Sequence, residues 1–113
     1  MAWAAGRCCC ATGEFMGWAG LKLVSGPING HHNFYDIGYR FRPAFWGRGY
    51  GYEADQAWLT YGFETLKLPH ICAYANAENT ASRQILARVG LRQGNEFVEN
   101  GARCVWYAAD APQ

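Results

Sequence analysis

The pattern of apolar and polar positions at the start of the chain predicts a pair of strands. Residues 2–10 are small and apolar, and the Thr12-Gly13 pair that follows them is a turn signal. Residues 15–24 are again mostly apolar and are long enough for a second strand. We therefore expect residues 2–24 to form a β-hairpin.

Residues 34–41 alternate between large apolar side chains and polar or small ones, which is the period of a strand. The large side chains of one face are expected to join the core: Tyr35, Ile37, Tyr39 and Phe41. The other face carries a carboxylate, a glycine and a cation: Asp36, Gly38 and Arg40. A face of that composition can line a functional site.

A helix is predicted over Glu53–Leu66, and Pro69 stands just beyond its end. The expected buried stripe consists of small and apolar positions: Ala54, Ala57, Trp58, Tyr61, Gly62, Thr65 and Leu66. Three polar positions fall off that stripe and are expected to face solvent: Asp55, Gln56 and Glu64. Glu53 in the first turn suits the positive end of the helix dipole.

The last third of the chain predicts a strand, a helix and a hairpin. Residues 70–75 form a short buried type of strand, so the preceding helix joins two strands in a right-handed parallel crossover. Asn79 or Thr80 is a natural N-cap for a helix that runs to Val89, with Gly90 as its stop. Residues 91–98 and 103–108 then form a hairpin across Asn100-Gly101. The predicted fold class is α+β, with a mixed, mostly antiparallel sheet and two helices.

Composition and charge narrow the class of protein. A chain of 113 residues, half of them hydrophobic, is large enough for one domain with a single core. The net charge is +1 and the ten basic residues are scattered, which argues against a dense basic face for nucleic acid. No apolar run approaches the roughly 18 residues of a membrane span. The first residues lack the charged segment of a signal peptide, so we expect a cytoplasmic protein with no membrane or nucleic-acid partner.

The five cysteines do not form a disulfide framework or a zinc motif. Cys8, Cys9 and Cys10 are adjacent, and on a strand their side chains would point to alternating faces and could not share one ion. Cys72 and Cys104 fall inside strand-like runs and are expected to be small buried side chains. No metal site is predicted.

The loop before the first helix carries the strongest chemical signal from the residues alone. Gly47, Gly49 and Gly51 stand at alternate positions, with Arg48 between the first two. Glycines let a ligand approach the backbone closely, and the N–H groups at a helix start attract anions. The loop therefore predicts a phosphate cradle, although an ordinary glycine-rich connection has the same composition.

Two motifs together resemble the GNAT acyltransferase superfamily, in the branch of ribosomal-protein alanine N-acetyltransferases of the RimJ/RimL type. The first is YDIGYRFRPAFWGRGYGYEA at residues 35–54, and the second is NAENTASRQILARVGL at residues 76–91. The resemblance covers about residues 12–108. It implies acetyl-CoA as co-substrate, no metal, and an amine acceptor that is a small molecule or a protein N-terminus.

The resemblance also implies which residues hold acetyl-CoA. The backbone of Phe41 and Arg42 would meet the pantetheine arm, and Asn79 would bond the same region. The amides of Gly47 to Gly51 would hold the pyrophosphate. The full set of implied cofactor-binding positions is Phe41, Arg42, Trp46, Gly47, Arg48, Gly49, Tyr50, Gly51, Asn76 and Asn79.

Asp36 and Ser82 are the candidate catalytic residues. An amine attacks the thioester directly, and Asp36 stands where this branch usually carries a glutamate that could take the amine's proton. Ser82 would lie near the thiol and would protonate or hydrogen-bond the leaving thiolate. Each has a structural alternative: Asp36 as a surface or salt-bridged carboxylate paired with Arg40, and Ser82 as a first-turn residue that bonds only the backbone of its own helix. His31 and His32 are further acid–base candidates, although loop histidines are usually solvated.

One departure from the superfamily pattern concerns the acceptor side. The strand and two helices that usually precede the first hairpin have no counterpart, so we expect one N-terminally truncated GNAT-like domain over residues 1–113. Residues 2–10 would then form an exposed edge strand, and we expect a homo-oligomer that buries it. A non-catalytic acyl-CoA-binding module and a degenerate structural or interaction protein remain as alternatives.

Overall fold

The computed structural model describes residues 3–9, 15–41, 44 and 49–111. Its strands and helices follow one another along the chain as β1 (Trp3–Cys9), β2 (Phe15–Val24), β3 (Phe34–Phe41), α1 (Tyr50–Glu64), β4 (His70–Asn76), α2 (Thr80–Arg88), β5 (Arg92–Glu99) and β6 (Ala102–Asp110).

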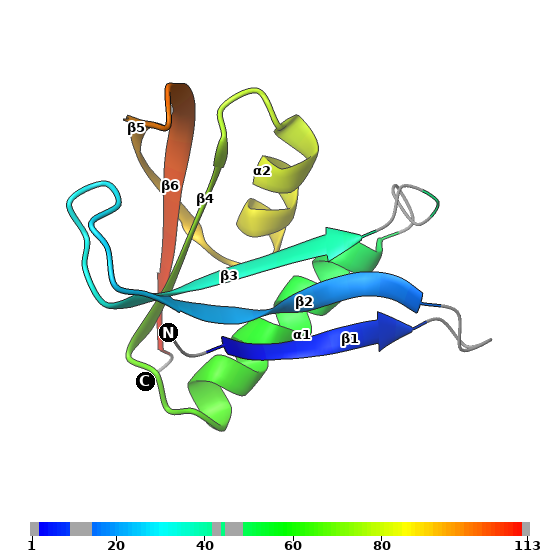
Figure 1. Ribbon diagram of the computed structural model, residues 1–113. Coiled ribbons are helices and arrows are strands. Elements are labelled where there is room, and N and C mark those ends of the chain that lie inside the picture. Colours follow the sequence, from blue (N-terminus) through cyan, green and yellow to red (C-terminus); the bar gives the residue numbers. More distant parts are fainter. Residues whose placement is uncertain (1–2, 10–14, 42–43, 45–48, 112–113) are drawn as a thin grey trace.

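The strands form one six-stranded sheet in the order β1-β2-β3-β4-β6-β5 (Figure 1). All neighbours pair antiparallel except β3 and β4, which are parallel and are joined by α1. The predicted fold class, the hairpins and the parallel crossover are therefore confirmed. β1 lies at one edge of the sheet, as the sequence predicted.

β3 and β4 pair as parallel strands at one position only, where Asp36 stands opposite Cys72. Beyond this pair the two strands diverge toward their C-terminal ends, and α2 lies near the opening (Figure 1). A sheet that opens in this way leaves backbone groups of both strands without partners across the gap. The opening is the feature of the fold that positions the site.

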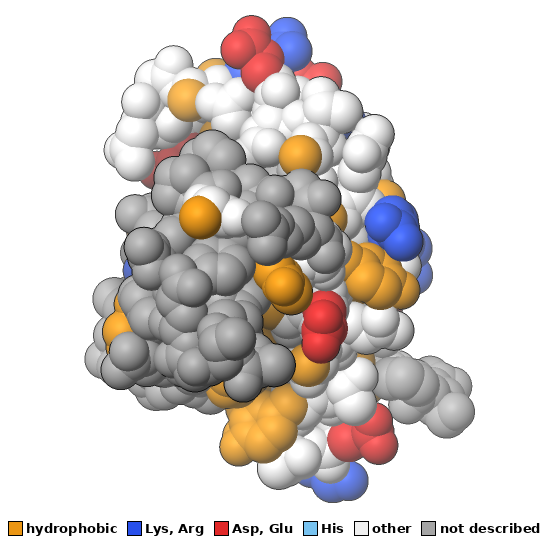
Figure 2. All heavy atoms as spheres, turned by 90° about the vertical axis from the view of Figure 1, so that its right-hand side faces the viewer, with side chains coloured by type: hydrophobic (Ala, Val, Ile, Leu, Met, Phe, Trp, Pro, Cys, Tyr) orange, Lys and Arg blue, Asp and Glu red, His pale blue; other side chains and the backbone are white. Residues whose placement is uncertain are grey.

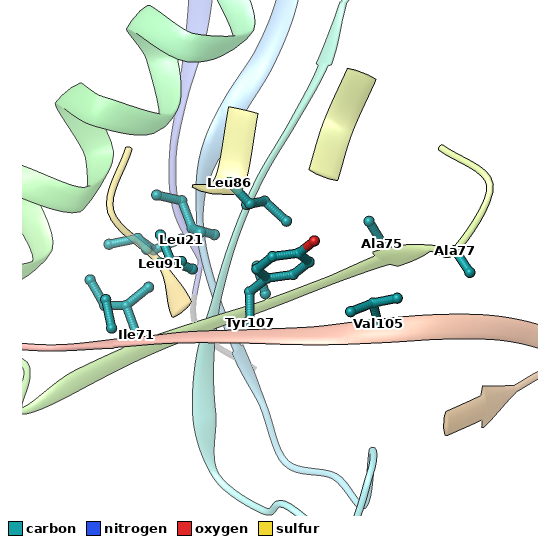
Figure 3. Packing of buried hydrophobic residues seen from close by; sticks show 11 residues of the cluster. Leu21, Ile71, Ala75, Ala77, Leu86, Leu91, Val105 and Tyr107 are labelled. Atoms are coloured by element: carbon teal, nitrogen blue, oxygen red, sulfur yellow. The ribbon is translucent and has the colours of Figure 1, made fainter. Parts of the chain in front are cut away.

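Both helices pack on one face of the sheet over an aliphatic core (Figure 3). Leu21, Ile71 and Val105 are completely buried at its centre. Helix α1 approaches the sheet closely because Gly62 has no side chain: a Cβ there would lie 2.6 Å from Ile71 Cδ1. On the other face of the sheet, Phe34, Cys72 and Trp106 form a second cluster. The buried positions expected for Cys72 and Cys104 are thus confirmed.

The sequence was wrong about the start and the buried face of α1. The helix begins at Tyr50 and ends at Glu64, so it includes Gly51 in its first turn. Its fully buried positions are Gly51, Asp55 and Gly62. Four positions of the predicted stripe are exposed instead: Ala57, Tyr61, Thr65 and Leu66. The close approach at two glycines fixes which side of α1 meets the sheet, and this outweighs the apolar side chains on the neighbouring side.

Helix α2 and the last hairpin follow their local signals. Asn79 is the N-cap of α2, because its Oδ1 accepts a hydrogen bond from the Ser82 backbone N–H at 3.1 Å. Asn100 and Gly101 both have positive φ, at 49° and 78°, as a tight hairpin turn requires. Within the described part of the chain, no helix is long and apolar enough to cross a membrane.

Candidate functional site

A pocket of about 870 Å³ lies between the first turn of α1, the helix α2 and the diverging strands β3 and β4. Figure 2 shows the end of the molecule at which β3 finishes. Charged side chains are scattered over the coloured part of this face and do not gather into a single patch.

The start of α1 forms one end of the pocket. Gly49 is the N-cap and adopts a left-handed conformation with φ of 82°, which favours glycine. Its carbonyl accepts the Glu53 N–H at 3.1 Å and closes the first turn. The N–H groups ahead of that bond, including that of Gly51, have no carbonyl partner within the helix. This end of the pocket can therefore bind an anion.

Gly51 is required by a close contact with β3. A Cβ at Gly51 would lie 2.6 Å from Tyr39 Cζ and 3.0 Å from Ile85 Cδ1. Because only hydrogen fits there, the Tyr39 ring lies directly against the first turn of α1. Tyr39 also lines the pocket, so this contact helps to set the shape of the pocket.

Six of the residues predicted for the site line this one pocket: Asp36, Gly49, Tyr50, Gly51, Asn79 and Ser82. Asn76 does not line the pocket, and its Oδ1 accepts the Glu78 N–H at 2.9 Å. The backbone of Phe41 ends β3 opposite Gly17. The remaining predicted positions lie outside the described residues: Arg42, Trp46, Gly47 and Arg48.

Asn79 and Ser82 are held in place by the start of α2. The Asn79 Oδ1 is occupied by the Ser82 backbone N–H, so the amide nitrogen of Asn79 is the group that can serve a ligand. Ser82 lies in the first turn of α2, is half-buried and lines the pocket. Its role near the thiol of the donor stays a prediction.

Asp36 lies on β3 where the two parallel strands meet and begin to diverge. Burial raises the pKa of its carboxyl from 3.8 to about 7. The positive charge of Lys22, which pairs with Asp36 from the neighbouring strand β2, lowers the pKa by a smaller amount. A carboxyl with such a pKa can take up and release a proton near neutral pH. Its position and its pKa both suit a general base.

Asp55 also lines the pocket, and the sequence pattern missed it. The residue is 1% exposed, and its Oδ1 has no hydrogen-bond partner among the described residues. Burial, and next the charge of Asp36, raise the pKa of Asp55 to about 7. An acidic residue one turn from Gly51 looks like a solvent-facing position by helical periodicity. The sequence of the helix alone contains no signal that this residue is buried.

Arg88 is a second residue of the site that the sequence did not single out. It lies at the end of α2, lines the pocket, and places its guanidinium 4.5 Å from the centre of the Tyr52 ring in the first turn of α1. The contact brings a cation to the anion-binding end of the pocket. The sequence shows that Arg88 belongs to the second motif, but it does not show that Arg88 contacts Tyr52.

Other candidate groups lie away from the pocket. His31 stacks on Trp106 on the opposite face of the sheet, with ring centroids 4.3 Å apart. Burial raises the pKa of the Cys72 thiol to about 11, which keeps it protonated and unreactive. Among the residues that the structure describes, no three His, Cys, Asp or Glu side chains gather as metal ligands.

The chain is similar to proteins of a known family. A profile of the family described as "Acetyltransferase (GNAT) domain" matches residues 1–92. The chain belongs to this family. The GNAT domain is 33% identical over 90 residues to FsC-acetyl coenzyme A-N(2)-transacetylase of Aspergillus fumigatus, a match that covers 77% of this chain and 38% of the relative. It is 38% identical over 68 residues to the uncharacterized N-acetyltransferase YnaD of Bacillus subtilis. This match covers 60% of this chain and 39% of the relative.

The fold comparison agrees with the sequence comparison. A Bordetella pertussis chain assigned to the GnaT-family acetyltransferases superposes with a TM-score of 0.83 and 23% identity, over 94% of this GNAT domain and 65% of that chain. At this identity the likeness is evidence of the fold. The GNAT domain spans about two fifths of the length of the curated relatives named above.

Proposed function

We propose that this GNAT domain binds acetyl-CoA and transfers the acetyl group to a primary amine by direct attack on the thioester. The observation that carries the proposal is the pocket itself. It combines an anion-binding helix start at Gly49, a carboxyl with a pKa of about 7 at Asp36, and the hydroxyl of Ser82. The printed name of the Aspergillus relative includes acetyl coenzyme A, which supports the donor.

The anionic part of acetyl-CoA is expected at the start of α1. N–H groups that have no carbonyl partner within the helix and the positive end of the helix dipole favour phosphate oxygens there, and Arg88 adds a positive charge. The opening between β3 and β4 leads from this end of the pocket toward Asp36. A donor whose phosphates lie at the helix start would therefore extend its thioester into the opening.

The reaction requires the protein to position the two reactants and to transfer protons. The amine nitrogen attacks the thioester carbon, the C–N bond forms, and the C–S bond breaks with departure of the thiolate. Asp36, when ionised, accepts a proton from the amine directly or through water. Ser82 donates a hydrogen bond, or its proton, to the sulfur. Holding these groups in a half-buried pocket strengthens each interaction because water is partly excluded.

Calorimetry and a thiol-release assay test the proposal together. We expect acetyl-CoA to bind the chain, and free thiol to appear only when a suitable amine is added. The amine panel should include a peptide with a free N-terminus, because we propose the RimJ/RimL branch and a protein N-terminus as one acceptor class. The same assay with the Asp36→Asn variant asks whether the carboxyl is needed.

A non-catalytic acyl-CoA-binding module is the second candidate, because the helix start and Arg88 can hold the phosphates of acetyl-CoA whether or not Asp36 acts as a base. Binding of acetyl-CoA without thiol release over the whole amine panel would favour this module. Absence of any binding would favour a structural or interaction protein.

We also propose a cytoplasmic location and a homo-oligomer that covers the edge strand β1. The edge position of β1 supports the oligomer, because no other strand among the described residues pairs with its outer side. Light scattering at micromolar concentration tests this directly. A clean monomer would count against it.

A further inference from the structure

The carboxyl of Asp55 presents an unusual combination of burial and missing partners. The residue is 1% exposed, and Oδ1 is fully buried without a hydrogen bond to any described residue. A buried polar atom without a partner costs free energy, and native proteins rarely keep one without a reason. A group that completes its hydrogen bonding only when a ligand is bound would supply such a reason.

The position of Asp55 indicates which part of a ligand it would meet. It lines the pocket one helical turn after Gly51, and Asp36 lines the same pocket from β3. The phosphates of a donor are expected at the start of α1, and the reacting thioester is expected near Asp36. The segment of the donor between phosphate and thioester is therefore the part that passes Asp55.

The charge state of Asp55 favours an uncharged partner. Burial and the nearby charge of Asp36 raise its pKa to about 7, so the surroundings oppose full ionisation at neutral pH. A metal ion or an ammonium group would require the ionised carboxylate and would reverse that shift. A neutral N–H donor fits better, because Oδ1 can accept a hydrogen bond in either protonation state.

We propose that Asp55 is a binding residue for the donor molecule, and that its Oδ1 accepts a hydrogen bond from an amide N–H on the arm that joins the phosphates of acetyl-CoA to its thioester. The inference rests on the proposed function, since it requires acetyl-CoA in this pocket. It adds a residue whose role is recognition of the arm, separate from the anion-binding end and from Asp36.

The same observation gives a test that separates binding from folding. Replacement of Asp55 by leucine removes a buried carboxyl whose Oδ1 has no hydrogen-bond partner among the described residues, and puts an apolar side chain in its place. The variant should therefore have a higher melting temperature than the wild type. It should also bind acetyl-CoA roughly tenfold more weakly, because the bound arm loses its acceptor. A purely structural residue would not raise stability while it lowers affinity.

The experiment is calorimetry on wild type, Asp55→Leu and Asp55→Asn with acetyl-CoA and, separately, with adenosine diphosphate, which has the phosphates but no arm. Asp55→Leu should weaken acetyl-CoA binding and leave the adenosine diphosphate Kd unchanged. Asp55→Asn keeps a carbonyl acceptor and should bind acetyl-CoA within about twofold of wild type. Gln56→Leu, at an exposed neighbouring position outside this pocket, is the matched control and should leave both Kd values unchanged.

The outcomes distinguish this inference from the proposed function. If the wild type binds acetyl-CoA and Asp55→Leu binds it equally well, the role of Asp55 is refuted and the proposed function stands. If Asp55→Leu weakens both ligands to the same extent, the residue shapes the whole pocket and the arm contact is refuted. A wild type that does not bind acetyl-CoA refutes the proposed function, and the inference with it.

Discussion

Replacement of Gly51 by alanine tests how the first turn of α1 and the pocket depend on each other. The added methyl group would lie 2.6 Å from Tyr39 Cζ, 2.7 Å from Tyr39 Oη and 3.0 Å from Ile85 Cδ1. At these distances atoms overlap, so the Tyr39 ring must move. Since Tyr39 lines the pocket, the shape of the pocket must change with it.

Two opposing terms set the stability of the Gly51→Ala variant. Overpacking of this kind costs about 1–3 kcal/mol. Alanine in place of glycine inside a helix stabilises the fold by about 1 kcal/mol, because glycine loses more conformational freedom on folding. We therefore expect a net loss of about 1 kcal/mol, which lowers the melting temperature of a domain of this size by several degrees.

Binding should be affected more strongly than stability. We expect the Kd for acetyl-CoA to rise at least tenfold in Gly51→Ala, because the first-turn N–H groups and Tyr39 both lose their native positions. Calorimetry measures this, and thermal unfolding followed by circular dichroism measures stability.

Gly62→Ala is the matched control. It adds a methyl group to the same helix at 2.6 Å from Ile71 Cδ1, but Gly62 does not line the pocket. It should lower the melting temperature by a similar amount and leave the Kd for acetyl-CoA within about twofold of wild type. If both variants weakened binding equally, or if Gly51→Ala bound normally, the link between Gly51, Tyr39 and the pocket would be wrong.

Three further predictions concern charged groups of the pocket. Asp36→Asn should lower amine-dependent turnover by about 10²- to 10⁴-fold with little change in the acetyl-CoA Kd. The wild-type kcat/KM should fall as the pH drops below about 7, because protonation of Asp36 removes the base. Full turnover by the variant would exclude Asp36 as base. The melting temperature should fall as the pH rises from about 4 to 7, because the unfolded carboxyls of Asp36 and Asp55 ionise near 4 while the folded ones stay protonated up to about 7. Asp55→Leu should flatten this dependence, and an unchanged slope would show that the raised pKa of Asp55 is wrong. Arg88→Ala should raise the Kd for acetyl-CoA several-fold and make binding less sensitive to salt, because a cation near the phosphates is lost; an unchanged Kd would place the phosphates elsewhere.

The parts of the fold that depend on neighbours in the chain were predictable from the sequence. Asn79 caps α2 and Asn100-Gly101 turns the last hairpin because the preferences of those residues act over three or four positions. The alternation in residues 34–41 likewise placed β3 correctly. These signals are local, so they do not depend on how the rest of the chain packs.

The orientation of α1 was not predictable in this way. Its apolar residues suggest one buried stripe, but Gly51 and Gly62 allow the helix to lie against Tyr39 and Ile71, and this contact turns Asp55 inward. The energy that decides the orientation comes from side chains on other elements. Periodicity within the helix contains no information about them.

The sequence by itself determined the kind of domain and most of its candidate site. Gly49 and Gly51 of the glycine-rich loop, together with Asp36, Asn79 and Ser82, are residues that the fold brings into one pocket. The tertiary structure alone decided that Asp55 and Arg88 belong to the same pocket, because their roles depend on contacts between elements far apart in the chain. Burial of a carboxyl oxygen that has no hydrogen-bond partner among the described residues is a property of the packed protein, and it arises only when α1 meets the diverging strands.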